Sequence, residues 1–310
     1  MATVLHHFIQ MLKIESSRLD SLLLSAKTYN MKNHFLLLVL LLSTLLKDTS
    51  AQYYQKDILN NKQAFADKNL LQEQKIREVM VHSFEGDKSP SKGFFCKKEI
   101  SKNYRTIATY TKSDISNKSL LTAYYNENGL LVKSIDSSAI SSATSTYSYD
   151  EKGNVVSILS VARSYDDDFV TTINEERQYK YDKKNKPAQL LRIKNKLDSV
   201  LIDFLQDEKG NVTDEIATGK NGKHYYYYYD DKNRLTDIVQ YNVVKAALVP
   251  DLIFEYNRQG QVTQMVSVEE GMSNNYYVWQ YIYNDEGLKI IEKCLSKERV
   301  LLGYFEYEYN

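Results

Sequence analysis

A run of five tyrosines gives this chain its clearest candidate for binding chemistry. Side chains alternate along a strand, so Tyr225, Tyr227 and Tyr229 would share one face and the rings between them would lie on the other. Tyrosine rings offer a flat, semi-polar surface suited to a sugar or a protein partner, and Trp279 is a candidate extension of it. The alternative is cross-strand packing of these rings within the sheet. Tyr225, Tyr227, Tyr229 and Trp279 are therefore the candidate binding residues.

The sequence contains no recognisable catalytic or metal-binding pattern. After residue 51 the histidines are His82 and His224, and together with Cys96 and Cys294 they lack the spacing of zinc ligands. No Gly-x-Ser-x-Gly, His-Glu-x-x-His, phosphate-binding loop or Gly-x-Gly-x-x-Gly occurs. Carboxylate pairs such as Glu269-Glu270 could serve a hydrolase, but they are common in polar β proteins. We therefore predict no catalytic residue, no metal site and no cofactor.

The acidic stretch Asp166 to Asp168 is the candidate for a calcium ion, because hard cations prefer clustered oxygen ligands. It lacks the spaced ligands and the turn glycine of a known calcium loop. We interpret it as a solvated acidic loop.

These residues belong to a unit that recurs seven times. An aromatic pair flanking one residue is followed by Asp or Asn, two polar residues, Gly or Asn, and an apolar run, most clearly in residues 147–156. The Gly or Asn positions are 129, 153, 185, 210, 233, 260 and 287, which are 23 to 32 residues apart. The first Asp or Asn can accept a backbone hydrogen bond, and the later Gly or Asn tolerates positive φ. Each unit therefore predicts a β-hairpin with a type I turn closed by a left-handed residue.

Some copies depart from the pattern. At Gly287 the next apolar position holds Lys289, which indicates a deletion or a bulge. Polar residues also interrupt apolar ones, as Asp214 does between Val212 and Ile216, which predicts faces that are only partly buried. The final Tyr307-Glu-Tyr309-Asn310 would begin an eighth turn, so we expect an unpaired half unit that forms an edge strand.

The pattern aromatic-x-Tyr-Asp-x-x-Gly-x-apolar resembles the YD repeat of the RHS family. It is carried by Tyr149-Asp150-Glu-Lys-Gly153-Asn-Val155 and Tyr256-Asn257-Arg-Gln-Gly260-Gln-Val262, and it covers residues 120–310. The resemblance implies long spiralling sheets of hairpins, as in polymorphic-toxin shells and some cell-surface adhesion proteins. A single hairpin is marginal in water, so successive units must share a sheet. We expect an all-β array of antiparallel hairpins, forming an extended twisted sheet or open solenoid with a short N-terminal helix.

Residues 31–51 match a secretory signal peptide that is cut after Ala51. Met31-Lys32 gives a basic start, an apolar stretch of 12 residues follows at 35–46, and small residues stand at Thr49 and Ala51. Spanning a bilayer takes about 20 residues, so a membrane anchor or a buried helix is the weaker alternative. Residues 1–30 are interpreted as a mis-assigned start or a lengthened n-region. The predicted location is secreted or periplasmic, with no transmembrane span in the mature chain.

The segment between the signal and the repeats, residues 52–119, is expected to cap the array. Residues 62–74 have a helix-forming composition, residues 76–84 suit a strand, residues 89–93 a loop, and residues 94–110 one or two strands. Repeat arrays need atypical ends that cover an open apolar face. The repeat domain itself is residues 120–310.

The charge balance bears on the class of partner, and the cysteine content bears on disulfide formation. The 40 acidic and 40 basic residues become 37 and 35 once residues 1–51 are removed, because that segment holds three acidic and five basic residues. Such a balance leaves no electrostatic footprint for nucleic acid. Export would permit a disulfide, yet Cys96 and Cys294 do not require one, and we expect both to be free or buried.

The preferred hypothesis is a secreted or periplasmic, non-enzymatic repeat protein that binds a protein or glycan surface at the cell envelope. One alternative is a structural remnant or small relative of an RHS toxin shell. The other is a carboxylate-dependent hydrolase, which a concave pocket holding two convergent acids would favour.

Overall fold

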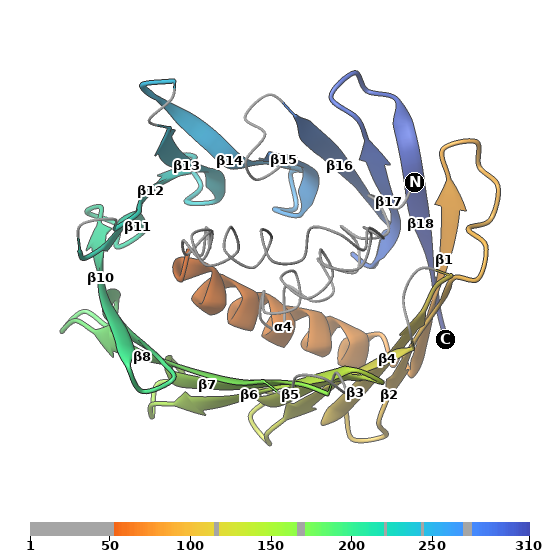
Figure 1. Ribbon diagram of the computed structural model, residues 1–310. Coiled ribbons are helices and arrows are strands. Elements are labelled where there is room, and N and C mark those ends of the chain that lie inside the picture. The colour runs from red at the N-terminus through yellow and green to blue at the C-terminus, as the bar shows by residue number, and fades with distance from the viewer. Residues whose placement is uncertain (1–52, 115–117, 166–170, 220–221, 243–244, 269–274) are drawn as a thin grey trace, which may run out of the picture.

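The chain folds as one closed barrel of 18 antiparallel strands around a single described helix (Figure 1). The computed structural model describes residues 53–114, 118–165, 171–219, 222–242, 245–268 and 275–310. The elements are α4 (Gln55–Glu73), β1 (Glu78–Glu85), β2 (Phe95–Ile100), β3 (Thr106–Lys112), β4 (Ser119–Tyr125), β5 (Leu131–Ser138), β6 (Ser141–Tyr149), β7 (Val155–Ser164), β8 (Thr172–Tyr181), β9 (Pro187–Lys194), β10 (Asp198–Gln206), β11 (Val212–Ala217), β12 (His224–Tyr229), β13 (Leu235–Asn242), β14 (Ala247–Tyr256), β15 (Val262–Val268), β16 (Tyr276–Tyr283), β17 (Lys289–Leu295) and β18 (Leu301–Tyr309).

The repeated turns have the predicted geometry. In the turn after β6, one carboxylate oxygen of Asp150 accepts hydrogen bonds from the backbone N–H groups of Lys152 and Asn154, at 2.9 and 2.8 Å. Gly153 closes this turn at a φ of 80°. Where the repeat has asparagine instead, Asn185 adopts the same left-handed region at 63°, which asparagine tolerates better than most residues. The turn chemistry was therefore predicted correctly.

Each of these turns is followed by a bulge that reverses the face of the next strand. In the pairing of β10 with β11, Gln206 lies opposite Val212, and the preceding Leu205 lies opposite Asp214. Strand β11 therefore has one extra residue between Val212 and Asp214. Val212 therefore faces inward, whereas Asp214 and Ile216 face outward. The prediction that these three side chains share a partly buried face is wrong, because an extra residue shifts the side-chain alternation by one.

Tyrosine hydroxyls link neighbouring hairpins at the rim where the turns lie, which we call the turn rim. In each case the last residue of a strand at this rim donates to the carbonyl oxygen of the first residue of the strand that follows the preceding turn. The bonds join Tyr149 to Leu131, Tyr181 to Val155, Tyr229 to Val212, Tyr256 to Leu235, Tyr283 to Val262 and Tyr309 to Lys289, at 2.5 to 2.9 Å. Gln206 makes the equivalent bond to Pro187 in a copy that lacks the tyrosine. The second aromatic residue of the repeat thus connects hairpins.

The sheet closes because the strand before the repeats pairs with the strand that ends them. Strand β1 pairs with both β2 and β18, with Val79 opposite Tyr309 and Glu85 opposite Gly303. The backbone N–H of Glu78 also donates to the carbonyl of Asn310. The expected open sheet or solenoid, and the expected terminal edge strand, are wrong. Closure pairs the backbone groups that an edge would leave open.

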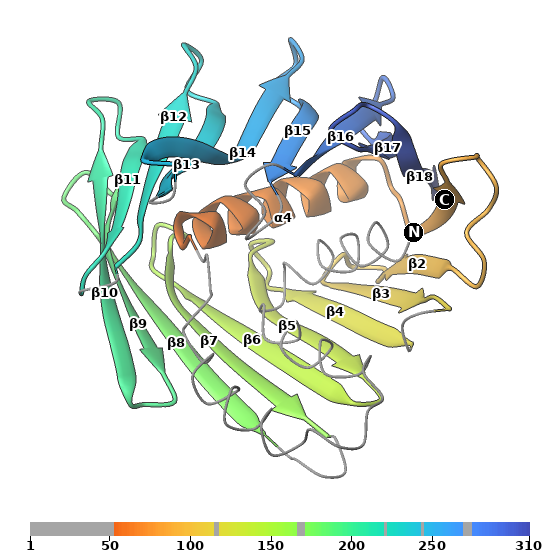
Figure 2. The same cartoon turned by 45° about the horizontal axis from the view of Figure 1, so that its top comes forward.

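Helix α4 lies inside the barrel and crosses its interior, rather than capping one end of the array (Figure 2). Ile58 of the helix and Tyr54, which precedes its first residue, belong to one buried cluster with residues of β7 to β13, among them Ile158, Leu190 and Ile202. The helix starts earlier than the predicted residue 62, whereas the strand predicted at 76–84 is confirmed as β1. The interior is wide enough to require a filling element, and the chain supplies it.

Of the two expectations for the copy at Gly287, the bulge is confirmed and the deletion is wrong. Its turn has the usual bonds, and Lys289 pairs with Tyr283 as the apolar residue does in other copies. The inward Lys289 ammonium lies 2.5 Å from the Glu292 carboxylate and 5.1 Å from the ring centres of Tyr281 and Tyr307. A charged residue is therefore accommodated at an inward position by a counter-ion and two rings.

We predict that Tyr229→Phe lowers the free energy of unfolding by about 1 kcal/mol, because it removes one hydrogen bond and leaves the Val212 carbonyl unpaired. Tyr228→Phe is the matched control, since that ring faces outward and is 47% exposed. Urea unfolding of both variants measures the difference. Equal stability of the two would contradict a stabilising role for the hydroxyl bridges.

Candidate functional site

The structure places the predicted binding residues in the barrel interior. Tyr225 and Tyr227 are 1% and 3% exposed, Trp279 is fully buried, and Tyr229 packs against the same core as Tyr227. A partner outside the barrel cannot contact the three buried rings as they lie here. The outward rings of this strand belong to Tyr226 and Tyr228, so cross-strand packing accounts for the inner row and corrects the expectation of an exposed ring ladder.

A buried carboxylate anchors the start of the internal helix. Glu215, on β11, is 2% exposed and accepts hydrogen bonds from the backbone N–H groups of Tyr54 and Gln55 at 2.8 and 2.9 Å. The hydroxyl of Tyr227 donates a further bond at 2.8 Å. The first N–H groups of a helix have no partner within the helix and carry partial positive charge. Glu215 therefore serves as the cap that the helix lacks in its own sequence.

An ion pair and two tyrosines hold the next turns of α4. The Asp57 carboxylate lies 2.6 Å from the Arg177 guanidinium, and the Tyr179 hydroxyl donates to the same oxygen at 2.6 Å. One turn later the side-chain amide of Asn61 donates to the Tyr149 hydroxyl at 2.7 Å. The N-terminal half of the helix is thus bound to the wall by directional contacts.

Burial changes the acidity of this anchor. Removal from water raises the pKa of Glu215 to about 7, although the bonds from Gln55, Tyr54 and Tyr227 act to lower it. Both of its oxygens are engaged and almost no surface is exposed. Glu215 and the neighbouring Asp57 are convergent acids, but a substrate has no access to the first, and the second is paired with Arg177.

The sequence carried a signal for this anchor that the motif search missed. The inward position three residues after the first apolar residue holds Ile158, Leu190, Ile238 and Met265 in four copies, Ser134 in one, and glutamate at 215 and 292. In both glutamate copies a tyrosine hydroxyl donates to the glutamate, from Tyr227 and Tyr307. An acid at a core position of a repeat is therefore a marker of an internal partner.

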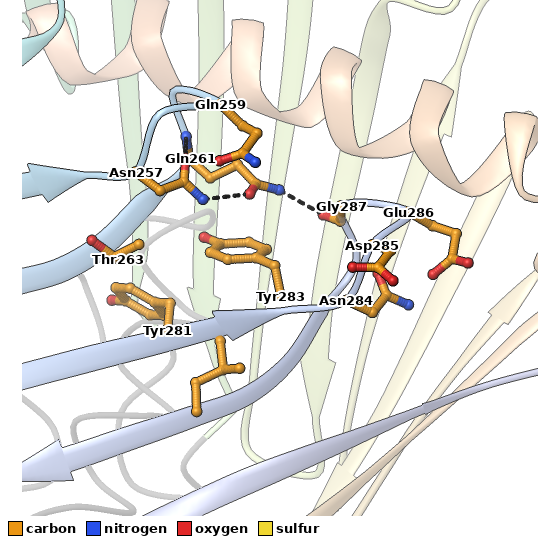
Figure 3. A pocket seen from close by; sticks show the side chains of 11 residues that line it. Asn257, Gln259, Gln261, Thr263, Tyr281, Tyr283, Asn284, Asp285, Glu286 and Gly287 are labelled. Carbon is orange, nitrogen blue, oxygen red and sulfur yellow. Dashed lines mark hydrogen bonds between the residues drawn. The ribbon is translucent and has the colours of Figure 1, made fainter.

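A cleft opens on the turn rim between two successive hairpins (Figure 3). Below the rim the ladder between β15 and β16 starts only at Gln264 opposite Gln280, so the hairpin tips separate. The cleft has a volume of about 530 Å³. It is lined by Asn257, Gln259, Gln261, Thr263, Tyr281, Ile282, Tyr283, Asn284, Asp285, Glu286 and Gly287.

Hydrogen bonds fix the walls of this cleft. The amide of Asn257 donates to Gln261 at 2.7 Å, and Gln261 donates across the gap to the carbonyl of Gly287 at 3.1 Å (Figure 3). The Tyr283 hydroxyl spans the same gap lower down, where it donates to the carbonyl of Val262 at 2.8 Å. The cleft is therefore a preformed space rather than a gap between loose loops.

The other sequence-based candidates are placed as follows. Cys96 and Cys294 are free and buried, as expected. Within the described residues no group of three or more His, Cys, Asp or Glu could hold a metal ion, and no described helix is long and apolar enough to cross a membrane. The acidic stretch 166–168, the pair Glu269-Glu270 and the signal at 31–51 lie outside the described residues.

Comparison with known proteins gives distant structural likenesses only. No protein-family model and no curated protein matches the sequence. A porin-like protein from Bacteroides uniformis aligns with a TM-score of 0.34 and 9% identity, over 76% of this chain and 98% of that one. The TcdB2-TccC3-Cdc42 complex gives 0.22 and 10%, over 73% and 18%, and the Photorhabdus luminescens Tc holotoxin pore gives 0.23 and 10%, over 70% and 15%. TM-scores this low transfer no function to the chain.

We predict that the stability of the barrel depends on pH through Glu215. Its folded pKa of about 7 lies above the ordinary 4.5, so the native state binds this proton more tightly than the unfolded state. The stability that the protonated Glu215 contributes to the folded state is fully present below about pH 4.5 and is lost as the pH rises through about 7. Between pH 5 and pH 8 the unfolding free energy of the unsubstituted protein should fall by a few kcal/mol more than that of Glu215→Gln, which has no titrating group at this position. Parallel curves for the two proteins would contradict the raised pKa.

Proposed function

We propose that this chain is an exported, non-enzymatic barrel that binds a partner at the cell envelope through its turn rim. The observation that carries the proposal is the preformed cleft between the tips of β14–β15 and β16–β17, which opens on the rim. In the described part of the interior, α4 occupies the space beside Glu215 and Arg177, which favours the rim as the binding surface. Binding therefore falls to the rim.

The outer wall supports an aqueous location in the secreted or periplasmic space. Lys293 faces outward from the middle of β17, and Lys133 and Asp237 face outward as the third residues of β5 and β13, as their register with neighbouring outward residues shows. Charged side chains in the middle of a hydrocarbon layer are costly. Together with the predicted signal at residues 31–51, these charges favour an exported protein surrounded by water.

The convergent acids of the described interior do not support the hydrolase alternative, and the pair Glu269-Glu270 lies outside the described residues. A carboxylate pair must reach a substrate, and here Glu215 is 2% exposed with its oxygens saturated by three donors. Asp57 is neutralised by Arg177. These acids are explained by the anchoring of α4.

A relative of the RHS toxin shells remains the second candidate. The observation in its favour is that the repeats enclose a segment of their own chain, since α4 lies within the barrel (Figure 2). In this case the partner of the barrel would be polypeptide inside it rather than a ligand on its rim.

We test the proposal with a substitution that fills the cleft. Gln259→Trp places a large ring at an exposed turn position of the cleft wall, and Lys184→Trp is the matched control at the same position of the turn after β8. The full chain and both variants are immobilised and exposed to envelope material from the native host. Gln259→Trp should lose retention at least tenfold, with the control unchanged. Equal retention by all three proteins would overturn a rim site.

The predicted export of the chain can be tested by the location and the N-terminal residue of the mature protein. The chain produced in its host should be recovered outside the cytoplasm with Gln52 as its first residue, and deletion of residues 31–51 should leave it in the cytoplasm. Recovery of the deleted form in the envelope would contradict the signal assignment.

A further inference from the structure

We propose that the rim cleft binds a neutral glycan, recognised by stacking of a sugar ring and by hydrogen bonds from its hydroxyl groups. This inference rests on the proposed rim site and narrows its ligand to one chemical class. It follows from the shape of the cleft, its uncommitted polar groups and its charge.

The size and the rings of the cleft fit a sugar. A volume of about 530 Å³ lies in the range of small-molecule sites, and one side is formed by Tyr281 and Tyr283 of the same strand face. Figure 3 shows both rings along the cleft, with the bridge from Gln261 to Gly287 at the tips of the hairpins. Phenol rings offer a flat, semi-polar surface for the apolar face of a pyranose. Because Tyr283 is held by its hydroxyl bond to Val262, its ring is already in place before binding.

The polar groups at the mouth of the cleft are free for a ligand. The side chains of Gln259, Asp285 and Glu286 make no hydrogen bond or ion pair with any other described residue, whereas Asn257, Gln261 and Asn284 are used in the turns. Two carboxylates and one amide provide several acceptors and one donor pair within one cleft. Vicinal hydroxyl groups of a sugar are complementary to such planar acceptors.

The charge of the cleft selects against anions. At the two central turn positions the seven copies read Glu-Asn, Glu-Lys, Lys-Lys, Glu-Lys, Asp-Lys, Arg-Gln and Asp285-Glu286. The last copy alone among these seven has two carboxylates. Arg258 of the facing turn is not among the residues that line the cleft, and the inward Lys289 is paired with Glu292. Uronates, sulfates and phosphates would therefore be repelled, and a neutral ligand that donates hydroxyl protons is favoured. A bound metal ion is disfavoured because no described group of three acidic, His or Cys ligands exists here.

This assignment also explains why one copy departs from the repeat at several positions. The copy around Gly287 combines the double acid of the turn with Lys289 and Glu292 on the inner side. The inner pair lies against Tyr281, whose ring centre is 5.1 Å from the Lys289 ammonium. The two turn carboxylates line the cleft, whereas the Lys289–Glu292 pair does not line it and reaches it only through the Tyr281 ring.

The test measures binding of the full chain to neutral hexose oligosaccharides and to uronate oligosaccharides of matched length. We expect binding to at least one neutral series and none to the uronates. The double variant Asp285→Asn/Glu286→Gln should weaken neutral binding about tenfold or more, because it replaces two charged acceptors. Glu151→Gln, at the position equivalent to 285 in the turn after β6, is the matched control and should bind normally.

Three outcomes would overturn the inference. Equal binding of uronates would remove the charge argument, and unchanged binding by the double variant would remove the carboxylates as ligands of the sugar. Binding to no neutral glycan, while Gln259→Trp still abolishes retention of envelope material, would exclude the glycan but leave the rim site standing. If Gln259→Trp also has no effect, the proposed function fails with it.

Discussion

The barrel depends on the hydrogen bonds that a tyrosine hydroxyl near the tip of one hairpin donates to a backbone carbonyl near the tip of the preceding hairpin. The ladders between hairpins stop short of the turn rim, as at Lys133 opposite Thr146 and Gln264 opposite Gln280. Beyond those points the tips would be joined only by side chains. The tyrosine hydroxyls span this distance to backbone carbonyls. They keep the tips in register, and a cleft between two tips can then have a fixed shape.

The internal helix is the second constraint, and it uses the same repeat positions. Where most copies place an aliphatic side chain, Glu215 accepts the first N–H groups of α4. The cost of burying this carboxylate is reflected in its raised pKa, and the helix terminus and Tyr227 offset part of that cost. An acid that would suggest catalysis in isolation is thereby committed to folding. Asp285 and Glu286, at the turn rim, also differ from the other copies of the repeat, and their carboxylates have no partner among the described residues.

Much of the local structure could be predicted, while the placement of the candidate site could not. The turn rules named Asp150 and Gly153 for the roles that they have, because those roles involve only neighbouring residues. Tyr225 and Tyr227 are candidates for a binding surface or for packing within the sheet on sequence grounds, because alternation distinguishes two faces but does not say which one is enclosed. The bulge after each turn also shifts the side-chain alternation by one residue, so that Ile216 faces outward while Val212 faces inward. Glu215 could have been found as an acid at a repeat position that is aliphatic in four of the seven copies.

The sequence by itself determined the all-β character, the positions of the hairpins and the chemistry of their turns, since a four-residue turn encodes its own geometry. Only the tertiary structure decided that the sheet closes, because closure joins β1 to β18 across more than two hundred residues and neither strand contains a signal for the other. It also decided which tyrosines are core, which acids are free and where two hairpin tips separate into a cleft. Those properties depend on curvature and enclosure, which arise from the pairing of the whole ring of strands.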